Sequence, residues 1–181
     1  MSNTARRVCV CILFSIVFSS CAKTENGGPG SPSTASTETP KASPSEGPPA
    51  NVVEASASPV ELTSGRSTDA LITVKIAPGY HINGNPSSKY QIATAVEISA
   101  SSGIMAGKAI YPPAVSKQFS FSPEPIMVYE KEVVIKQALS AEADAAKGSR
   151  TLVAKLRVQP CDDTVCYPPR TLGVSIPVDV K

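Results

Sequence analysis

Apolar and polar residues alternate with a period of two along several short runs between residues 51 and 181. This pattern limits the fold more than any other feature, because such residues place one face of a β-strand in a core. The runs are ALITVKI, TLVAKLRVQ, LGVSIPVDV and VYEKEVVIK. Their expected inward-facing positions are Ile72, Val74 and Ile76; Leu152, Ala154, Leu156 and Val158; Leu172, Val174, Ile176, Val178 and Val180; and Tyr129, Val133 and Ile135.

Segments rich in Gly, Pro, Asn and Ser separate these runs, and they predict turns: APGY, NGNPSS, YPP, SPEP and CYPP. We expect Asn83, Asn85 and Pro86 to form such turns. One segment, ALSAEADAAKG, predicts a short helix that ends at a glycine. Several short strands in about 130 residues predict an all-β domain over residues 51–181, an antiparallel β-sandwich of the immunoglobulin type.

The first 20 residues have the layout of a secretory signal peptide. Arg6 and Arg7 precede an apolar run from Val8 to Phe18, and the small residues Ser19 and Ser20 follow it. The run is shorter than the roughly 20 residues that span a bilayer, so a permanent transmembrane helix is the weaker interpretation.

The sequence FSSC around Cys21 resembles a bacterial lipobox, although Phe18 stands where leucine is usual. The resemblance implies that Cys21 is lipidated and becomes the mature N-terminus, with several acyl chains for stable anchoring. The alternative is ordinary cleavage that leaves Cys21 as an unpaired thiol. Ala22 follows the cysteine. The absence of an aspartate there favours the outer membrane over the inner membrane, by resemblance to lipoprotein sorting.

The composition of residues 22–50 predicts a disordered tether. Together with the lipidated Cys21, this tether makes up residues 21–50. Nineteen of the 29 tether residues are Pro, Ser, Thr or Gly, and none is a large aliphatic or aromatic residue. Such a segment buries too little apolar surface to offset the entropy of ordering. We expect it to hold the folded domain away from a membrane.

The charge balance argues against nucleic-acid binding. Two of the 17 basic residues, Arg6 and Arg7, lie in the signal segment, which leaves as many basic residues as the 15 acidic ones. Nucleic-acid-binding domains normally carry a basic patch or stripe, and the sequence has no such cluster.

Cys161 and Cys166 remain once Cys9 and Cys11 are removed with the signal and Cys21 is lipidated. An exported chain lies in an oxidising compartment, so we expect these two cysteines to form a disulfide across a turn between two strands. The pair has three interpretations: a structural staple, a redox-active disulfide and a zinc site. The zinc site is the weakest, because His81 is the only other soft ligand, and we expect no metal or cofactor. The residues alone leave the first two open.

The block VQPCDDTVCYPPRTLGVSIPV resembles the C-terminal signature of the N-terminal periplasmic domain of the thiol:disulfide interchange protein DsbD. The upstream segment PGYHINGNPSSKYQIATAVEI resembles the same family, as do the later YPP and YEKEVVI. The resemblance covers most of residues 65–181 in the same order. It implies an immunoglobulin-like sandwich whose disulfide receives electrons from a thioredoxin-like domain and passes them to periplasmic proteins.

By position in this family, Cys161 and Cys166 would be the catalytic pair. Cys166 would attack the partner's disulfide, and Cys161 would resolve the mixed disulfide. The family has a loop with an aromatic cap over the pair, and KQFSFSPEP is its counterpart, with Phe121 or Phe119 as the cap. The acidic residues that precede the aromatic in the family are absent here, and ordinary core packing is the alternative for both phenylalanines.

His81 lies in a segment that is near the cysteines in the family, which implies a proton shuttle. The alternative is a structural hydrogen-bonding residue in a turn rich in Gly and Asn.

DsbD continues into a membrane domain and a thioredoxin-like domain, whereas the printed chain ends at Lys181. We therefore expect redox partners in trans: a thioredoxin-like donor and exported, disulfide-bearing acceptors. The competing hypothesis is a lipid-anchored binding or scaffold module with a structural disulfide. A hydrolytic enzyme has little support, because no Ser or Cys motif places a nucleophile beside the single histidine.

Overall fold

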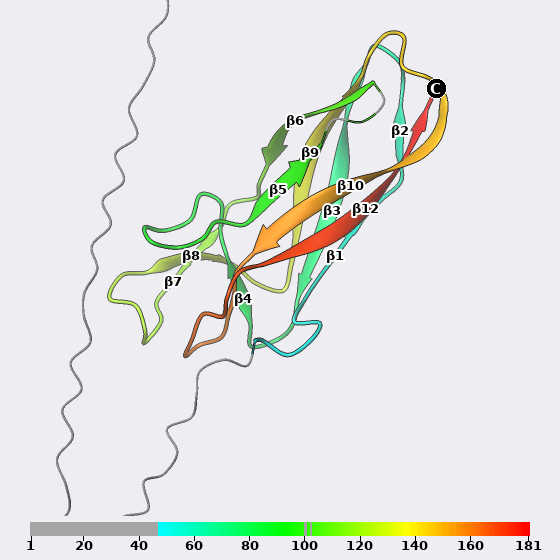
Figure 1. Ribbon diagram of the computed structural model, residues 1–181. Coiled ribbons are helices and arrows are strands. Elements are labelled where there is room, and N and C mark those ends of the chain that lie inside the picture. The colour runs from blue at the N-terminus through cyan, green and yellow to red at the C-terminus, as the bar shows by residue number, and fades with distance from the viewer. Residues whose placement is uncertain (1–46, 100, 102) are drawn as a thin grey trace, which may run out of the picture. The chain divides into compact units, whose positions relative to one another are not determined.

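The computed structural model of the chain describes residues 47–99, 101 and 103–181. The expected signal peptide, Cys21 and the tether up to residue 46 lie outside these residues. Every regular element of the described part is a β-strand (Figure 1). The strands are β1 (Val53–Ala57), β2 (Val60–Leu62), β3 (Ser67–Ile76), β4 (His81–Asn83), β5 (Ala95–Ile98), β6 (Ile104–Ile110), β7 (Val115–Lys117), β8 (Ile126–Tyr129), β9 (Glu132–Ala141), β10 (Gly148–Val158), β11 (Pro160–Cys161) and β12 (Arg170–Val180).

Two four-stranded sheets form a sandwich, as the alternating pattern predicts. One sheet has the order β1-β3-β9-β6 and is antiparallel throughout. The other has the order β2-β12-β10-β5, in which β2 pairs with β12 in parallel and the remaining neighbours are antiparallel. The expected all-β, immunoglobulin-like sandwich is therefore confirmed.

The core lies between these two sheets and consists mainly of aliphatic side chains. The inward positions predicted on β3 and β10 are all buried. On β12 the predicted positions from Val174 to Val180 are buried, while Leu172 is half-buried at the start of the strand. Burying a Val, Leu or Ile side chain stabilises the fold by about 1.5–3 kcal/mol, so these stripes account for much of the sandwich's stability.

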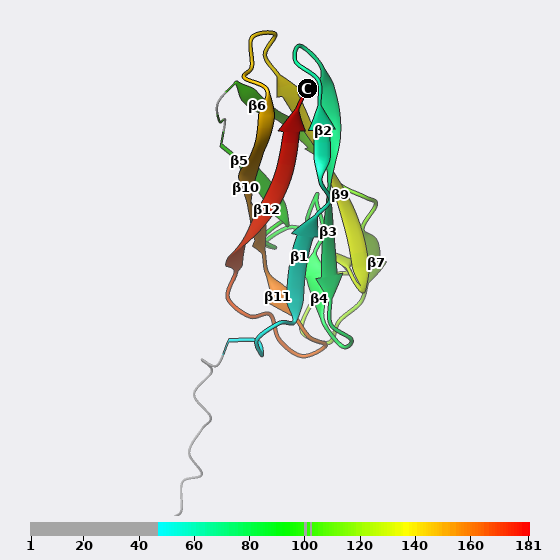
Figure 2. The ribbon, with the colours of Figure 1, turned by 90° about the vertical axis from the view of Figure 1, so that its right-hand side faces the viewer.

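A third small sheet, with the order β11-β4-β8-β7, lies at one end of the sandwich (Figures 1 and 2). Its strands are two to four residues long. It brings together three segments that are far apart in the sequence, and it carries the cysteine pair.

The helix predicted over ALSAEADAAKG is wrong. Strand β9 continues through Leu139 and Ala141, whose side chains are buried, and a turn follows in which the Ala145 N–H donates to the Glu142 carbonyl at 3.1 Å. Strand β9 is central in its sheet, paired with β3 on one side and β6 on the other. Pairing on both edges therefore overrides the helical propensity of the alanines.

The run VYEKEVVIK is also not one strand. It divides at Lys131, whose φ is 62°, so that Tyr129 belongs to β8 and Ile135 to β9. Both side chains are buried as predicted, and Val133 is half-buried.

The turn predicted at Asn83 is wrong as well, since His81 and Asn83 lie in strand β4. The bend comes later, at Asn85 and Pro86.

Candidate functional site

Cys161 and Cys166 form a disulfide that closes the turn between β11 and β12. The two residues are directly opposite each other in an antiparallel bridge. Hydrogen bonds flank them, from the Asp162 N–H to the Val165 carbonyl at 3.0 Å and from the Tyr167 N–H to the Pro160 carbonyl at 2.9 Å. The Cα atoms are 4.0 Å apart, just below the usual range for disulfides, because this type of antiparallel pair brings its backbones closest.

The two sulfur-bearing residues differ in exposure. Cys161 is fully buried, whereas Cys166 is half-buried and follows Val165, an exposed apolar residue. An incoming thiolate must reach a disulfide sulfur to exchange with it, so Cys166 offers the accessible side of this disulfide.

The Asp162 carboxylate organises the loop between the cysteines. One oxygen accepts from the Thr164 N–H (2.7 Å), the Thr164 hydroxyl (2.7 Å) and the Val165 N–H (2.9 Å), and the other accepts from the Tyr167 hydroxyl at 2.7 Å. These hydrogen bonds, led by that from the Thr164 side chain, hold the pKa of Asp162 well below its usual value. The same carboxylate raises the pKa of Tyr167 to about 12.

His81 lies beside the disulfide. It is the Cα partner of Cys161 in the antiparallel pair of β4 and β11, so the two side chains leave the sheet on the same face. Its side chain is buried, and its Nε2 has no hydrogen-bond partner among the described residues. The structural hydrogen-bonding role considered for His81 is therefore not supported at this nitrogen. Burial, and to a lesser extent the charge of Lys117, lowers the pKa of His81.

The two candidate cap residues form an aromatic stack on His81. The centroids of the Phe119 and His81 rings are 4.2 Å apart, and those of the Phe121 and Phe119 rings are 5.3 Å apart. Phe119 is buried and also packs with Ile126 and Val128, whereas Phe121 is 36% exposed.

The loop that carries the phenylalanines touches the disulfide loop directly. The Ser120 hydroxyl donates to the Asp163 carbonyl at 3.4 Å. The segment predicted to be the cap loop thus touches the loop between the two cysteines, with Phe119 as its inner ring and Phe121 as its outer ring.

Sequence reasoning did not identify the ion pair between Lys117 and Glu130, whose atoms lie 2.6 Å apart. The Lys117 ammonium also lies 5.3 Å from the centre of the Phe119 ring. No sequence signal links these two residues, because the pairing of β7 with β8 brings them together. The role of Asp162 has a local sequence signal, since an Asp side chain in a turn commonly accepts from the backbone N–H two residues later.

Two amide side chains, the buried Asn83 and the half-buried Gln159, connect strand β4 to the disulfide loop. The Asn83 side-chain NH₂ donates to the Ile92 carbonyl and to Gln159 Oε1, both at 3.0 Å. Gln159 in turn donates to the Tyr167 carbonyl at 3.1 Å. The Thr94 hydroxyl donates to the Asn83 carbonyl at 2.6 Å. Asn83 is therefore a buried strand residue that supports the site.

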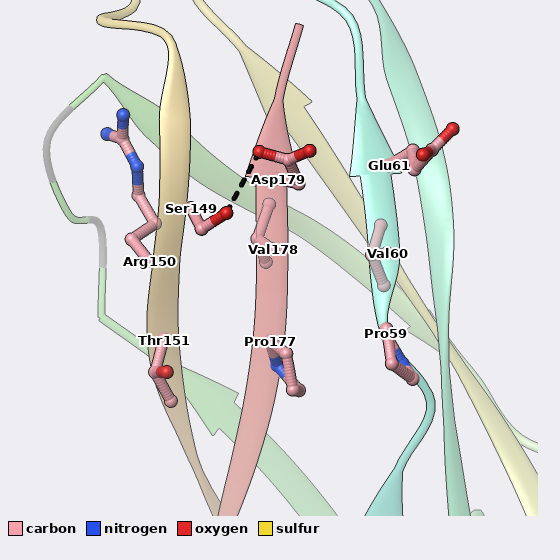
Figure 3. A pocket seen from close by; sticks show the side chains of 9 residues that line it. All are labelled: Pro59, Val60, Glu61, Ser149, Arg150, Thr151, Pro177, Val178 and Asp179. Carbon is pink, nitrogen blue, oxygen red and sulfur yellow. Dashed lines mark hydrogen bonds between the residues drawn. The ribbon is translucent and has the colours of Figure 1, made fainter.

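Two surface pockets lie in different parts of the domain, one beside the loop that carries the phenylalanines and one on the β2-β12-β10 face. One of about 460 Å³ lies between residues 88–91 and the loop from Phe121 to Ile126. Another of about 420 Å³ crosses β2, β10 and β12, where Ser149 donates to Asp179 at 3.1 Å (Figure 3). The second lies at the opposite end of the domain from β4 and β11 (Figures 1 and 2). Within residues 47–99, 101 and 103–181, no three His, Cys, Asp or Glu side chains are grouped so as to hold a metal ion.

The described part of the chain contains no helix long and apolar enough to cross a membrane.

The profile of the family described as "Thiol:disulfide interchange protein DsbD, N-terminal" matches residues 50–176. The chain belongs to this family. No curated protein matches it. Among solved structures, it is similar to the reduced N-terminal domain of DsbD from Neisseria meningitidis, with 18% identity, a TM-score of 0.44 and coverage of 64% of this chain and 82% of that one.

A second similar structure is the N-terminal periplasmic domain of ScsB from Proteus mirabilis. It is 18% identical with a TM-score of 0.46, and the match covers 70% of this chain and 45% of that one. Membership of the DsbD N-terminal family supports, in general terms, a role in thiol–disulfide exchange, redox partners of the thioredoxin type and a periplasmic location.

Proposed function

We propose that the chain is a periplasmic electron carrier whose Cys161–Cys166 pair accepts electrons from a thioredoxin-like donor and delivers them to exported proteins. The observation that carries the proposal is the unequal exposure of the two cysteines, with Cys161 buried and Cys166 half-buried at a surface turn. A structural staple requires no such difference, whereas exchange requires one sulfur within reach of a partner.

The reducing half of the cycle begins at Cys166. A donor thiolate attacks the Cys166 sulfur, the bond between the two cysteine sulfurs breaks, and Cys161 leaves as a thiolate. In this mixed disulfide, the donor's first sulfur is bonded to Cys166. The donor's second thiolate then attacks the donor's first sulfur and releases Cys166 as a thiolate. Two electrons pass to the pair, and the donor dithiol becomes a disulfide. Delivery to an acceptor is the reverse sequence, with Cys166 as the attacking thiolate and Cys161 as the resolving residue.

The loop from Lys117 to Pro125 is the cap of this site in the proposal. Phe119 covers the histidine beside Cys161, and Phe121 covers Phe119. The hydrogen bond from Ser120 to the disulfide loop is weak at 3.4 Å, so it adds little to the cost of separating the cap when a partner docks.

The proposal also includes lipidation of Cys21 and attachment to a membrane, the outer membrane in preference to the inner one. Its support is the signal-like segment and the lipobox-like FSSC, both in the printed sequence.

A specific observation favours a second candidate function, a binding or scaffold module with a structural disulfide. Cys161 is fully buried, and four hydrogen bonds to Asp162 hold the loop that the disulfide closes. Buried, well-ordered disulfides resist reduction.

The redox midpoint of the pair separates the two functions. The full chain is equilibrated in glutathione or dithiothreitol buffers, and free thiols are alkylated. The tryptic peptide VQPCDDTVCYPPR, residues 158–170, carries both cysteines, so its mass reports the pair independently of the other three cysteines. A midpoint between about −180 and −270 mV supports the electron carrier, and one below about −300 mV supports the structural disulfide.

A further inference from the structure

We infer that His81 is the general base that takes the thiol proton of Cys161 when the reduced pair returns to the disulfide. The inference rests on the proposed function and gives its site a residue for proton transfer.

The position of His81 is fixed by strand pairing. His81 and Cys161 are direct partners in the pair of β4 and β11, and opposite side chains in such a pair have Cβ atoms about 4.5–5.5 Å apart. Figure 2 shows these two strands side by side at the end of the domain. The Phe119 ring stacks on the imidazole at 4.2 Å and fixes the plane of the ring.

Cys161 needs a base because it is the buried member of the pair. An ordinary thiol has a pKa of about 8.5 and is mostly protonated at neutral pH, and burial favours the protonated form further. The thiolate is the nucleophile, so resolution by Cys161 is slow unless the proton is removed during attack.

The neighbouring carboxylate is not available for this task. Asp162 accepts four hydrogen bonds from Thr164, Val165 and Tyr167, which stabilise its ionised form and make it a weak base. Asp163 is exposed at the tip of the loop. Nε2 of His81, in contrast, is a buried nitrogen with no hydrogen-bond partner in the described part of the chain.

The surroundings of His81 keep the imidazole neutral and therefore able to accept a proton. Burial lowers its pKa most, and Lys117 on β7 lowers it further. Glu130, which follows β8, and Asp163 and Asp162 in the disulfide loop act in the opposite direction.

An acceptor disulfide oxidises the pair in two steps. Cys166 thiolate has attacked the acceptor disulfide, and the first acceptor sulfur has left as a thiolate. Nε2 of His81 then takes the proton of Cys161 while the Cys161 sulfur attacks the Cys166 sulfur. The bond between Cys166 and the acceptor breaks, and the second acceptor sulfur leaves as a thiolate. The pair loses two electrons to the acceptor, and the proton on His81 passes through solvent to an acceptor thiolate.

The experiment follows the reduced full chain after mixing with oxidised glutathione, from about pH 5.5 to about pH 8.5. Rapid acid quenching and the mass of peptide 158–170 separate formation of the mixed disulfide at Cys166 from its resolution by Cys161. The variants are His81→Gln, His81→Phe and Lys117→Met, and a thermal melt of each variant checks that it is folded.

We expect resolution in the wild-type chain to be nearly independent of pH near neutrality and to slow only below the pKa of His81. His81→Gln and His81→Phe should slow resolution at pH 7 by about 10²-fold or more, and the rate should then rise about tenfold per pH unit. Formation of the mixed disulfide should change by less than about threefold, because Cys166 performs that step. Lys117→Met should move the acid limb of the profile to higher pH, since Lys117 lowers the pKa of His81.

Two results would overturn the inference: an unchanged resolution rate in both His81 variants, or a slower rate whose pH profile matches that of the wild type, which indicates a packing role alone. The phenyl ring of His81→Phe can take the place of the imidazole in the stack on Phe119. Both outcomes can therefore be measured in this variant if His81→Gln is unstable. A wild-type chain that forms no mixed disulfide overturns the proposed function itself, a result distinct from either of these.

Discussion

Asp162 shows how one side chain can shape the loop without taking part in exchange. Its carboxylate accepts three hydrogen bonds inside the loop that the disulfide closes, and a fourth, from the Tyr167 hydroxyl, joins this loop to the chain segment that leads into β12. Removing the carboxylate leaves the Thr164 and Val165 N–H groups to solvent, so the effect falls on loop order rather than on the sandwich core.

We expect Asp162→Asn to lower the stability of the oxidised domain by about 1 kcal/mol at pH 7, or about 4 °C in Tm. The pKa of Asp162 is lowered in the folded state, so its stabilisation is present above the unfolded pKa of about 3.9 and is lost as pH falls through the folded pKa. The difference between wild type and variant in thermal melts should therefore shrink from pH 7 to about pH 2.

Asp163→Asn is the matched control, because it removes the same charge from the neighbouring, exposed position. It should leave Tm within about 1 °C. Equal effects of the two substitutions would show that net charge, and not the hydrogen bonds of Asp162, stabilises the loop.

At the scale of elements, the small sheet β11-β4-β8-β7 and the cap loop form the working end of the sandwich. The stack of Phe121, Phe119 and His81 has a buried inner ring and a 36% exposed outer ring. A cap acts through the ring that touches the site, so the inner ring should matter more to reactivity than the outer one.

We expect Phe119→Leu to speed reduction of the disulfide by dithiothreitol several-fold, and Phe121→Ala to change it by less than about twofold, because reduction depends on access to the sulfur. Leu keeps most of the apolar volume beside Ile126 and Val128, which limits the loss of stability. Pseudo-first-order rates at a fixed thiol concentration provide the measurement. A larger effect at Phe121 than at Phe119 would make the outer ring the cap.

An element can be predicted from the sequence when local residues decide its structure, and not when contacts between distant parts of the sequence decide it. The buried stripes on β3, β10 and β12 can be predicted because each strand's own alternation decides its buried face. The C-terminal part of β9 has the local pattern of a helix, but its pairing with β3 and β6 is a long-range contact that no local pattern shows. The segment of strand β4 predicts a turn because Gly and Asn flank it, whereas its partners β8 and β11 lie far away in the sequence.

The candidate site shows the same division. The cysteine pair and the phenylalanine loop were identified from short segments and a family resemblance. The position of His81 opposite Cys161, and the pairing of Lys117 with Glu130, depend on the register of short strands that no local pattern specifies.

For the whole molecule, the end of the domain at which the described chain begins bears on how partners reach the disulfide. The Arg170 guanidinium, four residues after Cys166, donates to the Val53 carbonyl at 3.3 Å. The first described residues thus lie at the same end of the sandwich as β4 and β11 (Figure 2). A partner that docks at the disulfide therefore approaches the end of the domain at which the described chain begins.

We therefore expect tether length to limit exchange with protein partners when Cys21 is lipidated. If residues 22–50 form the predicted tether, a flexible chain of about 29 residues has a typical span of about 30 Å, which is about the width of a thioredoxin-sized partner. Deleting residues 27–46 should slow reduction of the membrane-bound chain by a thioredoxin-like protein several-fold, because the remaining linker is shorter than the partner is wide. Reduction by dithiothreitol should not change.

The same deletion combined with Cys21→Ala provides the control. It removes the proposed lipid site, so the shortened chain should no longer fractionate with the membrane, and reduction by the protein partner should recover. Slow reduction that persists in the unanchored chain would mean that residues 27–46 themselves contribute to partner binding. If Cys21→Ala still fractionates with the membrane, another segment anchors the chain, and the expected effect of tether length then applies to that segment and not to the lipobox.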